Sequence, residues 1–391
     1  MNIDIKQVRA QTPGVSHVNH LVSAGASLMP QVVVDAVVDH INLEARIGGY
    51  GAANEQAEML DNVYNNVATL INAKPQEIAL VENATVAWCQ AFYALPLKRG
   101  DRVLTCQAEY AANYVAYLQR AKRDGIIIEV IPNDDKGAID VIALEKMLAT
   151  PAALISITWI PTNGGLVNPA IEVGKLASKH GVLYLLDACQ AVGQMVVDVK
   201  EIRCDFLSAT SRKFLRGPRG IGFLYIRETL IDALEPVVLD HFAAAWVETD
   251  RYELRSDARR FENWENAYAL RAGLGAALKY GQEIGLENIQ NRSWGLAQLL
   301  REQLNCIKGA QVHDAGEQQC AIVSFSIEGL SAQKTVAALR AKNIIIGTTS
   351  IDSTRLDFET RKLPDMMRAA PHYFNTEDEI EQMVAALKTL T

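Results

Sequence analysis

Polar side chains follow several short apolar runs of the sequence, at the point where each run ends. A carboxylate, Asp187, comes directly after the run 182–186, and an amine, Lys213, comes four residues after the run 206–209. The phenol of Tyr110 and several hydroxyl and amide groups follow the other runs. A lysine amine can form an imine with an aldehyde, and a carboxylate can hold a proton on a ring nitrogen. Brought together, these groups would turn a heterocyclic ring into an electron sink.

The apolar runs alternate with longer segments of helical periodicity. We predict strands at 78–81, 102–105, 126–131, 154–159, 182–186, 206–209 and 222–226, and helices at 84–95, 111–123, 141–148 and 171–180. This alternation predicts an α/β fold whose sheet is mostly parallel and lies between two layers of helices. Ligands of such sheets bind at the carboxyl ends of the strands. The polar residues should therefore meet at one edge.

Pyridoxal 5′-phosphate is the cofactor that such a set suits. It needs a lysine for its aldehyde, a carboxylate for its ring nitrogen and a flat group against its ring. It also needs a helix N-terminus and hydroxyl groups for its phosphate. Lys213, Asp187 and Tyr110 offer the first three, and Thr85 stands at the start of a predicted helix.

Two motifs resemble the class V aminotransferase and cysteine desulfurase group of fold type I pyridoxal-phosphate enzymes. One runs from Asp187-Ala188-Cys189-Gln190 to the segment TSRKFLRGPRG at 210–220, and the other is MRAAPHYFNT at 367–376. The resemblance covers nearly the whole chain. It implies a large domain with a mostly parallel sheet between helices and a small α+β C-terminal domain. We expect an N-terminal segment at 1–20, the large cofactor-binding domain at 21–255 and the small domain at 256–391.

The resemblance also implies roles for single residues. Lys213 is expected to hold the cofactor as an imine, and Asp187 to pair with its ring nitrogen. The further cofactor contacts are expected from Ala84, Thr85, Tyr110, Asn163, Gln190, Thr210 and Arg212. Arg368 matches the arginine that grips the substrate carboxylate, a role that suits its planar, bidentate guanidinium. Gly25 and Tyr50 are expected near the substrate, with a dimer interface as one way to bring Tyr50 there.

The sequence departs from the desulfurase pattern in two places. Arg212 stands where desulfurases have a histidine, and its charge is expected on the cofactor phosphate. No cysteine lies between Ile346 and Arg368, where desulfurases carry their nucleophile, and Cys320 is expected in the core. Transfer of sulfur through a persulfide is therefore disfavoured. Segments such as SAGASLMP at 23–30 resemble instead a subgroup of carbon–sulfur lyases, including those acting on hercynylcysteine sulfoxide, and isopenicillin N epimerase-like racemases.

The enzymes of this group begin by removing the α-proton of an amino acid. We expect β-elimination from a cysteine-derived substrate, with Lys213 as the base. An amino-acid racemase or epimerase is the first alternative, and it would need a second acid opposite Lys213. Transamination is the next alternative. A non-catalytic relative that only binds the cofactor is disfavoured because both Lys213 and Asp187 are present.

Composition limits the partners and the cell compartment. The 391 residues carry a net charge of −8, which disfavours nucleic acid or an anionic membrane as a partner. The six cysteines form no CxxC pair, so neither a metal site nor a disulfide framework is expected. Charged residues near the start argue against a signal peptide, and a cytoplasmic location is expected. The resemblance implies a homodimer with shared active sites that acts on a small amino acid.

Overall fold

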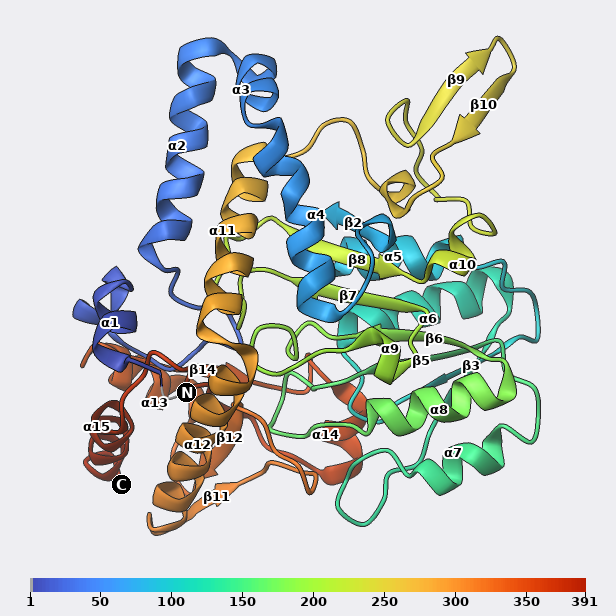
Figure 1. Ribbon diagram of the computed structural model, residues 1–391. Helices are drawn as coiled ribbons and strands as arrows, with labels where there is room; N and C mark the ends of the chain where they lie inside the picture. Colours follow the sequence, from blue (N-terminus) through green and yellow to red (C-terminus); the bar gives the residue numbers. More distant parts are fainter. Residues whose placement is uncertain (1–2) are drawn as a thin grey trace.

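A seven-stranded sheet forms the centre of the computed structural model, which describes residues 3–391 (Figure 1). Its strand order is β2-β8-β7-β6-β5-β3-β4. The strands are β2 (Ile78–Val81), β3 (Arg102–Thr105), β4 (Ile127–Val130), β5 (Leu154–Thr158), β6 (Leu183–Asp187), β7 (Phe206–Thr210) and β8 (Gly222–Ile226). Neighbours from β7 to β4 are parallel, and only β8 runs antiparallel to both of its neighbours. The predicted α/β fold with a mostly parallel sheet is confirmed.

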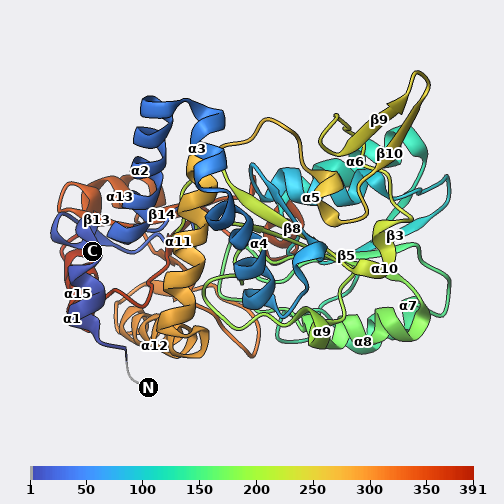
Figure 2. The same cartoon turned by 45° about the horizontal axis from the view of Figure 1, so that its top comes forward.

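Both faces of this sheet are buried, because successive side chains of a strand point to opposite sides. Leu186 packs into one apolar core, and its neighbour Leu185 packs into a second core across the sheet. Figure 2 shows helices on both sides. One face is covered by α5 (Ala84–Ala94) and α6 (Ala111–Asp124), and the other by α7 (Val141–Met147), α8 (Ala170–His180) and α9 (Val199–Ile202).

Four long helices lie beside the central sheet, of which the second contacts the edge strand β2 and the last packs against the C-terminal part of the chain. They are α2 (Gln31–Ile47), α4 (Ala57–Ile71), α11 (Tyr268–Ile284) and α12 (Leu286–Asn305), with α3 (Gly49–Glu55) at the top of Figure 1 and the short η2 (Pro75–Glu77) after α4. Helix α11 packs along α2 and α4. The apolar periodicity of residues 267–304 would suit one long helix. The structure divides it, because Gly285 has a φ of +87° that a helix interior does not allow.

Residues 244–254 form a β-hairpin that the sequence did not predict. It pairs β9 (Ala244–Glu248) with β10 (Arg251–Leu254) and projects away from the rest of the chain (Figure 1). Helix α10 (Glu228–Ile231) precedes it and η3 (Ala258–Phe261) follows it. The proposed domain boundary at 255/256 falls between β10 and η3.

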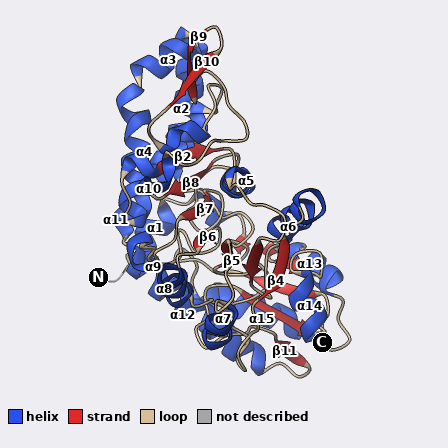
Figure 3. Ribbon diagram, turned by 90° about the vertical axis from the view of Figure 1, so that its right-hand side faces the viewer, coloured by secondary structure: helices blue, strands red, loops and turns tan. Residues whose placement is uncertain are grey.

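A second sheet, of four antiparallel strands, belongs to the C-terminal part of the chain. Its order is β11 (Ala310–Val312), β12 (Val323–Ile327), β15 (Met366–Ala369) and β14 (Gly347–Thr349). Three helices accompany it: α13 (Ala332–Arg340), α14 (Arg355–Arg361) and α15 (Glu377–Lys388). Figure 3 shows its strand β11 apart from the column formed by β2, β8, β7 and β6.

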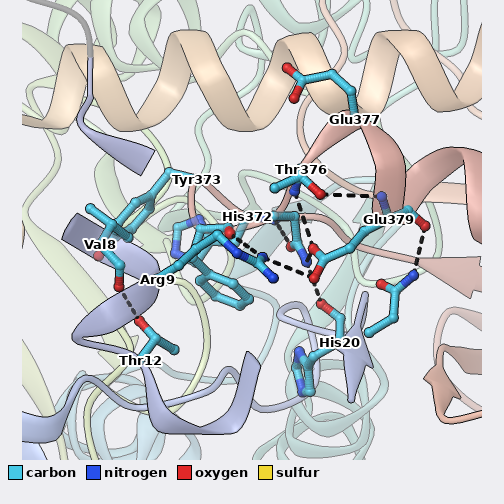
Figure 4. A network of polar contacts seen from close by, with 12 residues as sticks. Val8, Arg9, Thr12, His20, His372, Tyr373, Thr376, Glu377 and Glu379 are labelled. Carbon is cyan, nitrogen blue, oxygen red and sulfur yellow. Dashed lines mark hydrogen bonds and ion pairs between the residues drawn. The ribbon is translucent and has the colours of Figure 1, made fainter. Parts of the chain in front are cut away.

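Residues 3–20 pack on this C-terminal part. They contain α1 (Ile5–Ala10), η1 (Pro13–Ser16) and β1 (Asn19–His20), and β1 pairs with β13 (Ile344–Ile345). Figure 4 shows the polar contacts that join the two ends of the chain. Arg9 donates to the Glu379 carboxylate at 2.9 Å, and Asn375 donates to the His20 carbonyl at 3.1 Å. Within residues 3–391, no helix is both long enough and apolar enough to span a membrane.

Candidate active site

An anion-binding corner lies where β2 and β7 end together. Val81 of β2 and Thr210 of β7 both align with Gly222 of β8, so the start of α5 at Ala84 lies beside Thr210. Only glycine fits at Gly222, since a Cβ there would lie 2.4 Å from a backbone oxygen of β7. The free N–H groups of a helix N-terminus favour a bound anion. The corner therefore combines a helix start with the Thr85 and Thr210 hydroxyls.

Asp187 ends β6 at the middle of the same sheet edge and is 6% exposed. Its carboxylate accepts hydrogen bonds from the Cys189 backbone N–H at 2.9 Å and from Asn113 Nδ2 at 3.0 Å. Burial raises the pKa of Asp187, while these two hydrogen bonds and the charge of Lys213 act in the opposite direction. The side chain is thus fixed in place with its charge facing the lysine.

A second buried carboxyl group, Glu109, lies behind Asp187. It accepts hydrogen bonds from the hydroxyls of Thr105 and Thr158 and from Asn113 Nδ2, the last at 3.0 Å. Burial is the main reason that its pKa is raised. Sequence analysis assigned no role to Glu109 or Asn113. Only their position could have indicated a role, since both follow the end of the predicted strand at Thr105 by no more than eight residues.

Lys213 lies on the loop after β7 and is 8% exposed. It lines a pocket together with Asp187 and Cys189. Burial raises the pKa of the Cys189 thiol, and the charge of Lys213 beside it only partly offsets this effect. Sequence analysis missed Cys189 as a pocket residue, although it lies two positions after Asp187.

One pocket collects most of the side chains that the sequence singled out. The predicted residues in its wall are Ala84, Thr85, Tyr110, Asp187, Gln190, Thr210, Arg212 and Lys213. The carboxyl ends of β2, β5, β6 and β7 supply this wall. These groups therefore surround one space, at the sheet edge where the strand ends were expected to bring them together.

Arg368 approaches the pocket from β15 of the second sheet. Its Nη1 donates to the backbone oxygen and the hydroxyl of Thr162, at 2.7 and 2.6 Å, and Thr162 lines the pocket. Gly25 lies against it, since a Cβ on Gly25 would be 3.9 Å from Arg368 Nη2. Burial lowers the pKa of Arg368 to about 10, and the nearby charge of Arg212 acts in the same direction.

Two expected residues lie elsewhere. Asn163 was expected at the cofactor ring, but its Nδ2 donates to Asp357 of α14 at 2.7 Å, and it is not among the residues that line the pocket within residues 3–391. The reason is the competing carboxylate, which binds the amide to the C-terminal part. Tyr50 was expected near the substrate. It lies on α3 and is 76% exposed, so a single chain does not bring it to the pocket.

The pocket fits pyridoxal 5′-phosphate on its own chemistry. It places an amine, a buried carboxylate and a helix N-terminus around one space, as the aldehyde, ring nitrogen and phosphate require. Gln190 adds a further sign. Its Oε1 is buried and has no hydrogen-bond partner within residues 3–391, although its Nε2 donates to the Ala24 carbonyl at 3.1 Å. A buried acceptor of this kind calls for a donor from a ligand.

Known proteins resemble this chain over nearly its whole length. The family model described as Aminotransferase class-V matches residues 19–383. A probable cysteine desulfurase of Pyrococcus abyssi is 27% identical over 98% of this chain and 97% of its own length.

Solved structures give the same fold. The apo structure of the cysteine desulfurase from Thermococcus onnurineus NA1 has a TM-score of 0.93 and 27% identity, and covers 100% of this chain and 98% of its own. The cystine C–S lyase C-DES, in complex with cysteine persulfide, has a TM-score of 0.87 and 23% identity, and covers 97% of this chain and 99% of its own.

Proposed function

The chain belongs to the aminotransferase class-V family of fold type I enzymes, whose cofactor is pyridoxal 5′-phosphate, and we propose that it is a carbon–sulfur lyase. The proposed reaction is β-elimination from a cysteine-derived amino acid, which releases the sulfur group and leaves pyruvate and ammonia. The finer assignment to the subgroup of hercynylcysteine sulfoxide lyase-like enzymes is part of this proposal. The relative C-DES is named a cystine C–S lyase, which is in keeping with it.

The cofactor, when bound, supplies an electron sink that stabilises negative charge at the substrate Cα. Lys213 takes the α-proton, because among residues 3–391 it is the one amine in the pocket wall. Asp187 keeps a proton on the ring nitrogen, and Asn113 and the Cys189 N–H keep Asp187 oriented. The helix start at Ala84, with the Thr85 and Thr210 side chains, holds the phosphate. Arg368 binds the substrate carboxylate.

The placement of the thiols carries the choice of elimination over persulfide transfer. A persulfide mechanism needs a reactive thiolate that reaches the substrate sulfur. The loop from Gly347 to Arg355 has no cysteine, and Cys320 is fully buried with its pKa raised to about 12. Cys189 is in the pocket wall, but burial raises its pKa and keeps it protonated. Elimination needs no thiol from the protein.

Racemisation is a second candidate, and Tyr110 is the observation that favours it. Its phenol lines the pocket and its pKa is raised, chiefly by burial, so it is a protonated acid at neutral pH. A racemase needs such an acid on the face of the substrate opposite Lys213. Deuterium incorporation at Cα with loss of optical rotation, and without pyruvate, would select this alternative.

We also propose a homodimer. The helix α2 exposes Val38, Ile41 and Ile47, and the β9–β10 hairpin exposes Trp246, at 76%. Exposed apolar side chains that recur along one helix, and an exposed tryptophan, are in keeping with protein interfaces. A partner chain would cover these surfaces and would bring Tyr50 toward an active site. Sedimentation velocity of the cofactor-loaded protein at micromolar concentration tests this, and a single monomer boundary would contradict it.

The reaction is tested by incubating cofactor-loaded enzyme with L-cysteine, L-cystine, S-alkyl-L-cysteines and their sulfoxides. Pyruvate is measured with lactate dehydrogenase, and the released sulfur species with a thiol reagent. Equimolar pyruvate and sulfur product are expected. Formation of alanine together with enzyme-bound sulfur would identify a desulfurase and would contradict the proposal.

A further inference from the structure

Two guanidinium groups meet at one glycine on the rim of the pocket. Arg212 donates through Nη1 to the Gly25 carbonyl, and a Cβ on Gly25 would lie 3.9 Å from Arg368 Nη2. The two charges lie close enough for Arg212 to help lower the pKa of Arg368. Two like charges at this distance repel each other, so their common placement requires something that pays the electrostatic cost.

No carboxylate among residues 3–391 forms an ion pair with either guanidinium. Arg368 donates only to the oxygens of Thr162, and its Nε is buried without a partner. The buried Arg301 shows the contrast, since Asp314 pairs with it at 2.8 Å. Burial of an unpaired charge is unfavourable unless a ligand neutralises it. The rim therefore has two positive charges to offer to a ligand.

The carboxylate in the pocket, Asp187, does not neutralise the charges of Arg212 and Arg368. Asp187 is opposed by Lys213 and held by Asn113 and Cys189, and neither arginine contributes to its pKa. At Tyr110, by contrast, both Arg212 and Arg368 act on the phenol. The charges are thus sorted, with Asp187 and Lys213 together and the two arginines together on the rim.

Arg212 makes its polar contacts away from the phosphate corner. Its Nη1 bonds Gly25, its carbonyl accepts from the Ser27 N–H at 2.8 Å, and neither Thr85 nor Thr210 bonds its side chain within residues 3–391. The phosphate corner has its own donors in the first turn of α5 and the two threonine hydroxyls. Arg212 is therefore free to bind an anion other than the cofactor phosphate, to which the sequence had assigned it.

We propose that the substrate carries two anionic groups, its α-carboxylate at Arg368 and a second acidic group of its side chain at Arg212. The inference rests on the proposed function in taking an amino acid as substrate, and it narrows the class to cysteine derivatives whose sulfur substituent bears a carboxylate. The planar guanidinium of Arg212 suits such a group, because it can donate two parallel hydrogen bonds.

Unreactive ligands test this without any turnover. Succinate and glutarate carry two carboxylates and no amine, and their monoamides have the same size with one charge fewer. Dissociation constants are measured by calorimetry on the cofactor-loaded enzyme in a chloride buffer. The diacid is expected to bind at least about tenfold more tightly than its monoamide in the wild type. A ratio near one would overturn the proposal.

Arg212→Met separates the two roles of the arginine, with Arg219→Met, an exposed residue of the same loop, as the matched control. In Arg212→Met the ratio is expected to fall below about threefold while cofactor affinity stays within about threefold, and in Arg219→Met both are unchanged. Arg212→Lys, which keeps the charge, is expected to retain part of the preference and covers the case in which Arg212→Met does not fold. A loss of cofactor affinity with the ratio intact would assign Arg212 to the phosphate and overturn the proposal.

A second comparison keeps this inference distinct from the reaction. S-carboxymethyl-L-cysteine and S-carbamoylmethyl-L-cysteine differ only in the acidic group, and pyruvate release from the acid is expected to be at least about tenfold more efficient. Absence of pyruvate from both, with the diacid preference intact, would refute β-elimination while supporting the two-anion site.

Discussion

Asn113 Nδ2 lies 3.0 Å from Asp187 Oδ2 and also 3.0 Å from Glu109 Oε1, so that one side-chain amide joins two buried carboxyl groups. The amide nitrogen donates one hydrogen bond to each carboxyl group and so holds both in place. Without it, Asp187 would lose the strongest interaction that opposes the effect of burial on its pKa. The ability of Asp187 to stay charged against the cofactor therefore depends on Asn113 of α6, which lies 74 residues away in the sequence.

Asn113→Ala is expected to raise the pKa of Asp187, because it removes the hydrogen bond that favours the charged form. The acid limb of the kcat/KM profile should move to higher pH, and the pH dependence of the cofactor absorption band should move with it. Lys122→Ala, on the same helix but exposed, is the control. An acid limb at its original position in Asn113→Ala would show that the amide does not tune Asp187.

Lys213→Ala is expected to lower turnover by at least about a thousandfold, because it removes the only amine that the described part of the chain, 3–391, places in the pocket wall. The cofactor should also leave on gel filtration, whereas the wild type keeps it bound. The exposed Lys200→Ala serves as the control for a general loss of positive charge. Retention of turnover in a folded Lys213→Ala protein would favour a binding protein over an enzyme.

Cys189→Ala is expected to keep pyruvate release within about threefold of the wild type, because the raised pKa leaves a thiol that is not a nucleophile. Alkylation with iodoacetamide should be slow at Cys189 and fast at the exposed Cys306. If pyruvate release fell by more than about a hundredfold in Cys189→Ala, then the thiol would be part of the chemistry.

Glu262→Gln is expected to change the pH dependence of stability. Burial raises the pKa of Glu262 to about 7 from an ordinary value of 4.5. The folded protein therefore holds this proton more tightly than the unfolded chain, and the contribution is full below pH 4.5 and is lost as the pH rises through 7. The free energy of unfolding of the uncharged variant, relative to that of the wild type, should rise by on the order of 3 kcal/mol between pH 4.5 and pH 8.

Thermal unfolding of both proteins at pH 5 and pH 8 measures this difference. Glutamine keeps an oxygen that can accept from the Tyr64 hydroxyl and the Leu80 N–H, which now bond Glu262 at 2.9 Å each. Glu283→Gln, an exposed residue of α11, is the control. An equal difference between Glu262→Gln and the wild type at both pH values would mean that Glu262 has an ordinary pKa.

The strands, and the polar residues that follow their ends, could be predicted from the sequence. Continuous apolar runs specify strands buried on both faces, and a polar residue must follow where the run leaves the sheet. That argument places Asp187 and Thr210 correctly at the edge, next to Lys213. It also predicts α5 and α6 within one residue of their observed bounds.

Contacts between distant segments were beyond the same argument. The periodicity at 267–304 does not show that Gly285 turns to a positive φ, and the charged residues around Arg251 do not show a hairpin. Asn163 follows a strand end as Asp187 follows another, but its partner Asp357 lies 194 residues away. The helices α2 and α4 were not predicted, and without them the exposed position of Tyr50 could not be known.

The most direct test of β-elimination is a set of parallel incubations in deuterated water, one for each substrate. Cofactor-loaded enzyme is given S-carboxymethyl-L-cysteine, L-cysteine and a panel of other L-amino acids, and pyruvate and optical rotation are followed together. Pyruvate from a cysteine derivative, in step with release of its sulfur group, is the predicted result. Deuterium at Cα with loss of optical rotation and no pyruvate would contradict it and would make the protein a racemase.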